Sequence, residues 1–252
     1  MPAALCHDHF NRLLVALSAD EFKRLTPCLE LVTLPRGLCI YQPETVVQYA
    51  YFPTSTVVSL LYEMDDGAMV ETAVVGNEGM VGVALFLGGE STLSRAVVQS
   101  AGYAYRLKGE CLKREFHRAG PMQKILMRYT QALMTEMSQT LVCVRHHSLK
   151  QQLCRWLLIR FDRLNTNRLD MSQESIASLL GVRRAAISEI ASKLRGAGLI
   201  SYERGRITLL DRQGLEQLSC GCSAAINAEQ DRLLPKVNRL NEVISEHDAE
   251  VC

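Results

Sequence analysis

The sequence has no long hydrophobic run. No uninterrupted apolar stretch reaches the roughly 18 residues that a membrane-spanning helix needs. The N-terminal residues, MPAALCHDHFNRLL, also lack the basic segment and the apolar block of a secretory signal. We therefore expect a cytoplasmic protein without a membrane partner.

Flexible linkers, low-complexity segments and a disulfide framework are missing as well. A chain of 252 residues with 48% hydrophobic and 22% charged residues is long enough to form two cores. Its nine cysteines lack regular spacing, and Cys111, Cys143 and Cys154 fall on apolar faces of expected helices. We predict reduced, buried thiols rather than disulfides.

The first half of the chain has the pattern of many short strands. After a pair of amphipathic helices expected between Asn11 and Leu29, β-type runs alternate with turn signals. The runs cover residues 30–37, 38–41, 49–52, 57–62, 69–75 and 95–99. This spacing predicts an antiparallel β-roll of the barrel or jelly-roll type. Because residues 31–107 contain no histidine, a His-ligated metal enzyme of the cupin kind is excluded, and we predict that the protein is not an enzyme.

A long helix is expected from Pro121 to His146, because proline suits a first helical turn. Apolar residues and threonines recur along it alternately four and three residues apart, which is the heptad seam of a two-stranded coiled coil. The seam consists of Leu126, Thr130, Leu133, Met137, Thr140 and Val144. We predict a dimerisation helix; the alternative is a helix packed only on its own β-roll.

Residues 171–195 carry the pattern of two helices joined by a tight turn. Ser172 is a suitable N-cap, and apolar residues at helical spacing follow it. Gly181 then stands where a helix commonly ends in the left-handed conformation. Apolar periodicity resumes within a few residues, so the second helix, residues 183–195, should cross the first steeply and enter a major groove. Its groove side carries Arg183, Arg184, Ala185, Ser188, Glu189 and Ser192.

Two short strands around Arg204 and Gly205 predict a β-wing after this second helix, with Arg204 and Arg206 at its tip. Charge is concentrated in the same region. Residues 145–212 hold 13 Lys and Arg against 6 Asp and Glu, a net charge of +7, whereas residues 213–252 have a net charge of −4. A basic region that coincides with such a motif is typical of a protein that binds nucleic acid. An ordinary helical hairpin with solvated arginines is the alternative.

The order of these parts resembles the Crp/Fnr family of bacterial transcription regulators over roughly residues 10–220. The most specific matches are MSQESIASLLG at 171–181, LRGAGLI at 194–200 and RGRITL at 204–209. The resemblance implies an α+β fold and a homodimer that reads a palindromic double-stranded DNA site, with RNA polymerase as a further partner if the protein is an activator. Its four parts would be a cyclic-nucleotide-binding-like sensory β-roll (1–120), a dimerisation helix (121–146), a winged helix-turn-helix domain (147–212) and an acidic helical extension (213–252).

The resemblance also assigns the residues that face DNA. Base-reading positions fall on Arg184, Ala185 and Glu189, and Ser172 and Gln173 lie towards the phosphate backbone. Ala185 stands where the family usually has glutamate, and Glu189 where it usually has arginine or serine, so the preferred half-site should differ. The complete predicted set is Ser172, Gln173, Arg183, Arg184, Ala185, Ser188, Glu189, Lys193, Arg204 and Arg206.

The expected effector pocket departs from the cyclic-nucleotide pattern of the family. The matching residues are Gly82, Val83, Ala84, Ser94, Arg95 and Ala96. Val83 replaces the glutamate that would bind the ribose, and Arg95 is displaced by one residue from the position of the phosphate-binding arginine. A slip of one residue turns a strand side chain to the opposite face. We expect another effector or none, and the alternative for Arg95 is a surface ion pair.

Iron–sulfur ligation is not retained either. Members that bind a cluster use several closely spaced N-terminal cysteines, and this N-terminus has only Cys6. The segment Cys6–His9 could ligate a metal or haem, although a tail without a ligand is the preferred interpretation. The pair His146–His147 is interpreted as a cation pair at a helix end.

The cofactor is therefore left unknown, with haem or a small-molecule effector as options, and no metal site is predicted. Cys220 and Cys222 with Cys252 form a possible thiol sensor, because a zinc site would lack a fourth ligand. As alternatives to an effector-modulated DNA-binding regulator, we consider a signal receptor that acts through protein contacts and a cyclic-nucleotide-responsive regulator.

Overall fold

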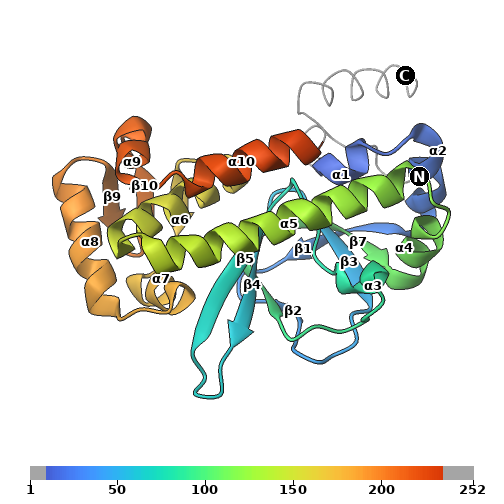
Figure 1. Ribbon diagram of the computed structural model, residues 1–252, viewed down its shortest axis with the longest axis horizontal. Helices are drawn as coiled ribbons and strands as arrows, with labels where there is room; N and C mark the ends of the chain where they lie inside the picture. Colours follow the sequence, from blue (N-terminus) through green and yellow to red (C-terminus); the bar gives the residue numbers. More distant parts are fainter. Residues whose placement is uncertain (1–9, 235–252) are drawn as a thin grey trace.

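The computed structural model describes residues 10–234, which form an N-terminal β-roll and a C-terminal helical domain joined by one long helix (Figure 1). This helix, α5 (Pro121–His146), runs across the molecule and connects the two parts. No helix within residues 10–234 has the length and hydrophobicity to cross a membrane.

The N-terminal part begins with short helices that polar side chains cap. Asn11 caps α1 (Arg12–Val15), and Ser18 forms a capping box with Glu21 at the start of α2 (Ala19–Leu25). A 3-10 turn, η1 (Thr26–Cys28), leads into the first strand. The apolar residues of α1 enter the core of the β-roll.

Seven antiparallel strands form the β-roll, and they are arranged in a three-stranded sheet, β1-β7-β3, and a four-stranded sheet, β2-β6-β4-β5. The strands are β1 (Leu29–Leu34), β2 (Cys39–Tyr41), β3 (Tyr49–Pro53), β4 (Val57–Glu63), β5 (Met69–Val75), β6 (Arg95–Ser100) and β7 (Gly102–Lys108). A short helix, α3 (Ala84–Leu87), precedes β6. The predicted α+β architecture with an antiparallel β-roll is confirmed.

Strand β7 and the short helix α3 of the roll were not predicted from the sequence pattern. Strand β7 pairs with β1 from Leu29–Leu107 to Leu34–Gly102 and with β3 on its other edge, so it is the central strand of its sheet. Ala104 and Leu107 are completely buried, while the residues between them are partly exposed.

Beyond the roll, α4 (Gly109–Phe116) leads into α5, which has Pro121 in its first turn. One face of α5 packs on the β-roll through Met122, Tyr129 and neighbouring apolar residues. The prediction that Cys111 is a reduced thiol is wrong, because Cys111 forms a disulfide with Cys28. The end of η1 and the helix α4 are brought side by side by the pairing of β1 with β7, a contact that no local pattern indicates. Cys143 and Cys154 are buried, free thiols.

The C-terminal domain begins with α6 (Leu149–Leu164), which Ser148 and Gln151 cap at its start. It continues with β8 (Arg168–Asp170), α7 (Gln173–Leu180), α8 (Arg184–Gly196), β9 (Ile200–Glu203) and β10 (Arg206–Leu209). The three strands form a small sheet in the order β8-β10-β9. Apolar residues of α6, α7, α8 and the sheet share a second core, which makes this domain one packing unit.

The chain then returns to the long helix. After α9 (Arg212–Leu218), the helix α10 (Cys222–Leu233) packs along α5 (Figure 1). The helical extension predicted for residues 213–252 is therefore helical as far as Leu233, and residues 235–252 lie outside the described part of the chain.

Two buried ion networks fix α6 against the β-roll and α5. Arg160 of α6 pairs with Glu71 of β5, and Trp156 Nε1 donates to Glu71 Oε1 at 3.1 Å. Arg163 contacts Glu136 Oε2 at 2.6 Å and Glu78 Oε1 at 2.8 Å. Burial acts to lower the pKa of Arg163, but the two carboxylates outweigh burial and raise it. The helical domain is thus attached to the roll by charged side chains that are largely buried.

Candidate nucleic-acid interface

The helix-turn-helix begins at Ser172, as the sequence predicted. The Ser172 hydroxyl accepts a hydrogen bond from the Ser175 amide at 3.1 Å, which satisfies a free donor in the first turn of α7. Gly181 ends α7 with a φ of +66°, and α8 starts three residues later at Arg184. The apolar residues Ile187, Ala191 and Leu194 hold α8 on the domain core. The opposite face of α8 is therefore left for a ligand.

The exposed face of α8 contains the residues that were predicted to contact bases. Arg184 is exposed at the first position of the helix, and its Nε lies 3.9 Å from Glu174 of α7. Lys193 bonds to Glu189 Oε1 at 2.6 Å, one helical turn away, and this contact lowers the pKa of Glu189. The rest of the predicted α8 surface, formed by Ala185, Ser188 and Ser192 together with the preceding Arg183, lies on the same side of the helix. The predicted residues thus form one accessible polar surface.

The predicted wing is a hairpin of β9 and β10. Its turn residues Arg204 and Gly205 have φ angles of +49° and +79°, as a two-residue hairpin turn requires. The Met171 amide donates to the Gly205 carbonyl at 2.7 Å, so the wing is held next to the start of α7. Arg204 is exposed at the tip, while Arg206 pairs with Asp170 at 2.9 Å.

Strand β8 was not predicted, and it completes this arrangement. It pairs with β10 through Leu169–Ile207, which places Asp170 beside Arg206. The exposed Ser172 and the half-exposed Gln173 follow directly at the N-terminus of α7. The helix α8, the wing and the start of α7 therefore lie at one end of the molecule (Figure 1).

A cavity of about 400 Å³ lies between the β-roll and α5, where the effector pocket was expected. Predicted residues Gly82, Val83, Ala84 and Ser94 line it. The remaining lining is mainly apolar and includes two tyrosines and four α5 residues that the prediction lacked: Tyr41, Tyr62, Thr130, Leu133, Met134 and Met137. None of the described residues that line the cavity is basic or acidic.

Two residues of the predicted pocket lie elsewhere. Arg95 points to the other face of the sheet, where its NH2 lies 2.9 Å from Glu63 and 3.2 Å from Gln42 Oε1. This is the surface ion pair that was the alternative for Arg95 after a one-residue slip, since neighbouring strand residues face opposite sides. Ala96 is completely buried in the core of the roll. The prediction that Arg95 and Ala96 line the effector pocket is therefore wrong.

The predicted seam of α5 is divided between two faces. Leu126 and Leu133 are buried in the core of the same chain, and Thr140 accepts a hydrogen bond from Arg155 of α6 at 3.4 Å. Leu126 and Leu133 thus face their own chain, so placing these two in a dimer interface was wrong, whereas Thr140 is half-exposed. The alternative of a helix packed on its own roll holds for this face.

A second apolar column lies one residue further along α5 and is exposed. Met127, Met134 and Leu141 have exposed fractions of 59%, 63% and 72% and are seven residues apart. Together with the predicted Thr130, Met137 and Val144, they give a continuous heptad stripe on the outside of the helix. The sequence contained this signal, because both columns have the same spacing, but periodicity alone does not show which column the roll covers.

The geometry defines a winged helix-turn-helix DNA-binding module attached to a β-roll. Residues 151–218 match the Crp-like helix-turn-helix domain. No curated protein sequence matches the chain significantly.

Comparison with solved structures shows that the fold of most of the chain is similar to that of known Crp/Fnr proteins. The chain is similar to FixK2 from Bradyrhizobium japonicum, with 18% identity, a TM-score of 0.66 and coverage of 76% of this chain and 98% of that one. It is similar to a Crp-family transcriptional regulator from Thermus thermophilus, with 20% identity, a TM-score of 0.63 and coverage of 75% and 96%. A third similar structure is the global regulator CLP of Xanthomonas campestris, with 16% identity, a TM-score of 0.63 and coverage of 76% and 99%.

The protein thus has a Crp-like DNA-binding domain within the fold of Crp/Fnr transcription regulators, and the resemblance inferred from its sequence is confirmed. Two of the similar structures, CLP and the Thermus thermophilus protein, are described as regulators.

Proposed function

We propose that this protein is a homodimeric transcription regulator that recognises a palindromic DNA site through α8, residues 183–195. The observation that carries the proposal is the exposed polar face of α8, in the same domain as the exposed wing arginine Arg204 and the exposed Ser172 at the N-terminus of α7. An α-helix with arginine near its start fits a major groove, and the flanking groups are placed for phosphates. A signal receptor without DNA binding would not need these three elements on one accessible surface.

Dimerisation is proposed through the exposed stripe of α5. Met134 and Leu141 are large apolar side chains in contact with solvent, and a second α5 packed alongside in parallel would cover them. A two-fold dimer would then present two copies of α8, and paired reading helices bind half-sites about 34–36 Å apart. The stripe therefore explains both an exposed apolar surface and the palindromic site.

For the effector, the cavity favours an uncharged and mainly apolar molecule. Its volume of about 400 Å³ suits a small ligand. Three of its lining residues, Thr130, Met134 and Met137, also belong to the exposed stripe of α5. A bound ligand would thus contact the proposed dimer interface, which gives it a direct route to the relative position of the two α8 helices.

Arg184→Ala is expected to weaken binding to the specific site by about 1–3 kcal/mol, because a bidentate arginine–guanine contact contributes that much discrimination. Binding to unrelated DNA should change little. Arg204→Ala serves as the comparison: it should weaken binding to all sequences alike and reduce the salt dependence by about one phosphate contact. Fluorescence anisotropy with a selected operator and a scrambled duplex, at several salt concentrations, measures both effects. If Arg184→Ala lowered the affinity for both duplexes equally, Arg184 would not be a base-recognising residue.

Cyclic AMP and cyclic di-GMP are expected to leave the melting temperature unchanged. CLP, one of the similar structures, is described as responsive to cyclic di-GMP. In this chain, however, the cavity offers no cation for a phosphate among its described lining residues, and Arg95 is paired with Glu63 on the opposite face. A ligand at a hundred times its Kd would stabilise the folded state by about 2.7 kcal/mol, which a thermal-shift assay detects as a clear rise in melting temperature. Such a rise would favour a cyclic-nucleotide-responsive regulator.

A further inference from the structure

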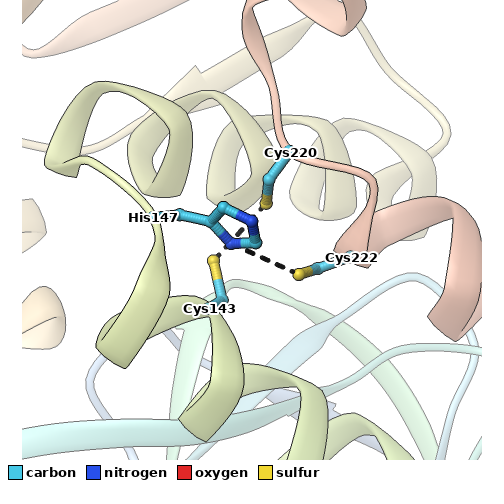
Figure 2. Close-up of side chains that lie close together, drawn as sticks. All are labelled: Cys143, His147, Cys220 and Cys222. Atoms are coloured by element: carbon cyan, nitrogen blue, oxygen red, sulfur yellow. Dashed lines mark hydrogen bonds between the residues drawn. The ribbon is translucent and has the colours of Figure 1, made fainter.

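Four potential metal ligands meet where the helical domain joins α5. Cys143 lies in the last turn of α5, and His147 directly follows that helix. Cys220 and Cys222 come from the connection between α9 and α10, more than 70 residues later in the sequence. Figure 2 shows the three sulfurs and the imidazole ring pointing toward a common centre.

The distances are those of ligands that share one ion. The four donor atoms all lie within 4.8 Å of one another. Cys143 Sγ is 3.5 Å from Cys220 Sγ, and Cys222 Sγ is 3.6 Å from His147 Nδ1. In a tetrahedral zinc site, bond lengths of about 2.3 Å to sulfur and about 2.0–2.1 Å to nitrogen place sulfurs about 3.8 Å apart and sulfur about 3.6 Å from nitrogen. The observed separations agree with that geometry.

The surroundings also suit a metal site. The three cysteines are buried and form a cluster of their own, separate from both main cores. Arg155 of α6 is only 5% exposed, and its Nε has no hydrogen-bond partner. Three thiolates and one Zn²⁺ carry a net negative charge, which a neighbouring arginine balances.

We propose that Cys143, His147, Cys220 and Cys222 bind a structural Zn²⁺ ion. Three thiolates and one imidazole in tetrahedral arrangement are a common structural zinc set. An iron–sulfur cluster distributes its ligands over two or more irons and needs them further apart. A disulfide between Cys143 and Cys220 would leave the convergence of Cys222 and His147 unexplained.

The proposed site departs from two sequence-based predictions. No metal site was predicted, because Cys220 and Cys222 were grouped with Cys252, which lies outside the described residues, and lacked a fourth ligand. His147 was interpreted as part of a cation pair at a helix end. The actual partners, Cys143 and His147, become neighbours of Cys220 only because α10 returns along α5. The segment Cys6–His9, the other possible ligand set, also lies outside the described residues.

A zinc ion here would fasten both ends of the DNA-binding domain to α5. The domain starts just after His147, at α6, and ends just before Cys220, at α9. One ion would thus join the end of α5, the start of α6 and the start of α10. If the proposed DNA-binding function holds, this connection fixes the angle between α5 and α8, and removal of zinc lowers the affinity for the operator.

Metal content tests the site independently of DNA binding. The full chain, purified with zinc in the medium and under reducing conditions, should carry about one zinc ion per chain by mass spectrometry of the metal. Replacement with Co²⁺ should give the intense visible bands of tetrahedral cobalt and a thiolate charge-transfer band. Cys220→Ser and Cys222→Ser should lose stoichiometric zinc, and His147→Ala should keep the charge-transfer band while its visible bands change. Cys39→Ser, a free cysteine of the β-roll, is the control and should bind as the wild type does.

Wild-type protein that is folded by circular dichroism, yet binds neither zinc nor cobalt, would overturn the proposal. A Cys143–Cys220 disulfide in reduced, zinc-supplied protein would do the same. If the variants lose zinc and the wild type still fails to bind any DNA, the site stands and the proposed DNA-binding function does not.

Discussion

Replacement of Arg160 by methionine, with Glu71 left in place, is expected to lower the free energy of unfolding by about 3–5 kcal/mol. Arg160 is 1% exposed, and its guanidinium pairs with Glu71 and lies 3.3 Å from the centre of the Trp156 ring. Without it, the Glu71 carboxylate would stay buried with only the Trp156 and Ser59 donors. An uncompensated buried charge is among the most destabilising changes in a protein core.

Urea unfolding followed by tryptophan fluorescence measures this effect, because Trp156 is the single tryptophan of the chain and belongs to the network. The matched control is the double variant Arg160→Met with Glu71→Met, which removes both charges. It should recover most of the lost stability, since replacing a whole buried pair by apolar residues is often neutral. A single variant as stable as the wild type would show that water reaches Glu71.

This ion pair and the second network, around Arg163, explain why α6 has a fixed position relative to the roll. Arg160 and Arg163 both extend from α6, one to β5 and the other to Glu136 of α5 and Glu78. Buried pairs of this kind contribute less to net stability than to the choice of one geometry over others. In this molecule they tie the domain that carries α8 to β5 of the roll and to α5, the helix that also lines the cavity.

The sequence predicted most of the elements because local signals define their ends. Ser172 and Gly181 delimit α7, Pro121 starts α5, and Arg204–Gly205 forms the wing turn; each acts within a few residues. Strand β7 was missed because Gly102–Lys108 follows β6 after a single residue, so no separate turn segment divides the two strands. Strand β8 was missed because three residues are too short for any periodicity.

Contacts between distant segments could not be predicted in this way. The pairing of Cys28 with Cys111 depends on the register of β1 with β7, and the meeting of Cys143 with Cys220 depends on the return of α10 along α5. Arg95 shows the opposite case. Its displacement by one strand position was visible in the sequence, and alternation of faces was enough to offer a surface ion pair as the alternative to the pocket, which is what the structure shows.

The second prediction with a large expected effect concerns the exposed stripe of α5. Leu141→Glu should raise the dimer dissociation constant roughly a hundred- to a few-thousand-fold, because each protomer would bury an unpaired carboxylate opposite that of its partner. Leu141 is 72% exposed in the single chain, so the substitution should leave the folded protomer intact. A monomer carries only one α8, so its affinity for the palindrome should be about 10²–10⁴-fold lower, since binding through two linked sites raises affinity by that factor.

Val142→Glu is the matched control, because Val142 is also aliphatic and exposed but lies about 100° around the helix from Leu141. Sedimentation velocity gives the oligomeric state, and anisotropy with one or two half-sites gives the affinity. The Leu141 variant should sediment as a monomer and bind both duplexes with the same low affinity, whereas the Val142 variant should behave as the wild type. If Leu141→Glu remained a dimer, the stripe would not be the interface, and the apolar surface of Met127, Met134 and Leu141 would have to serve another contact.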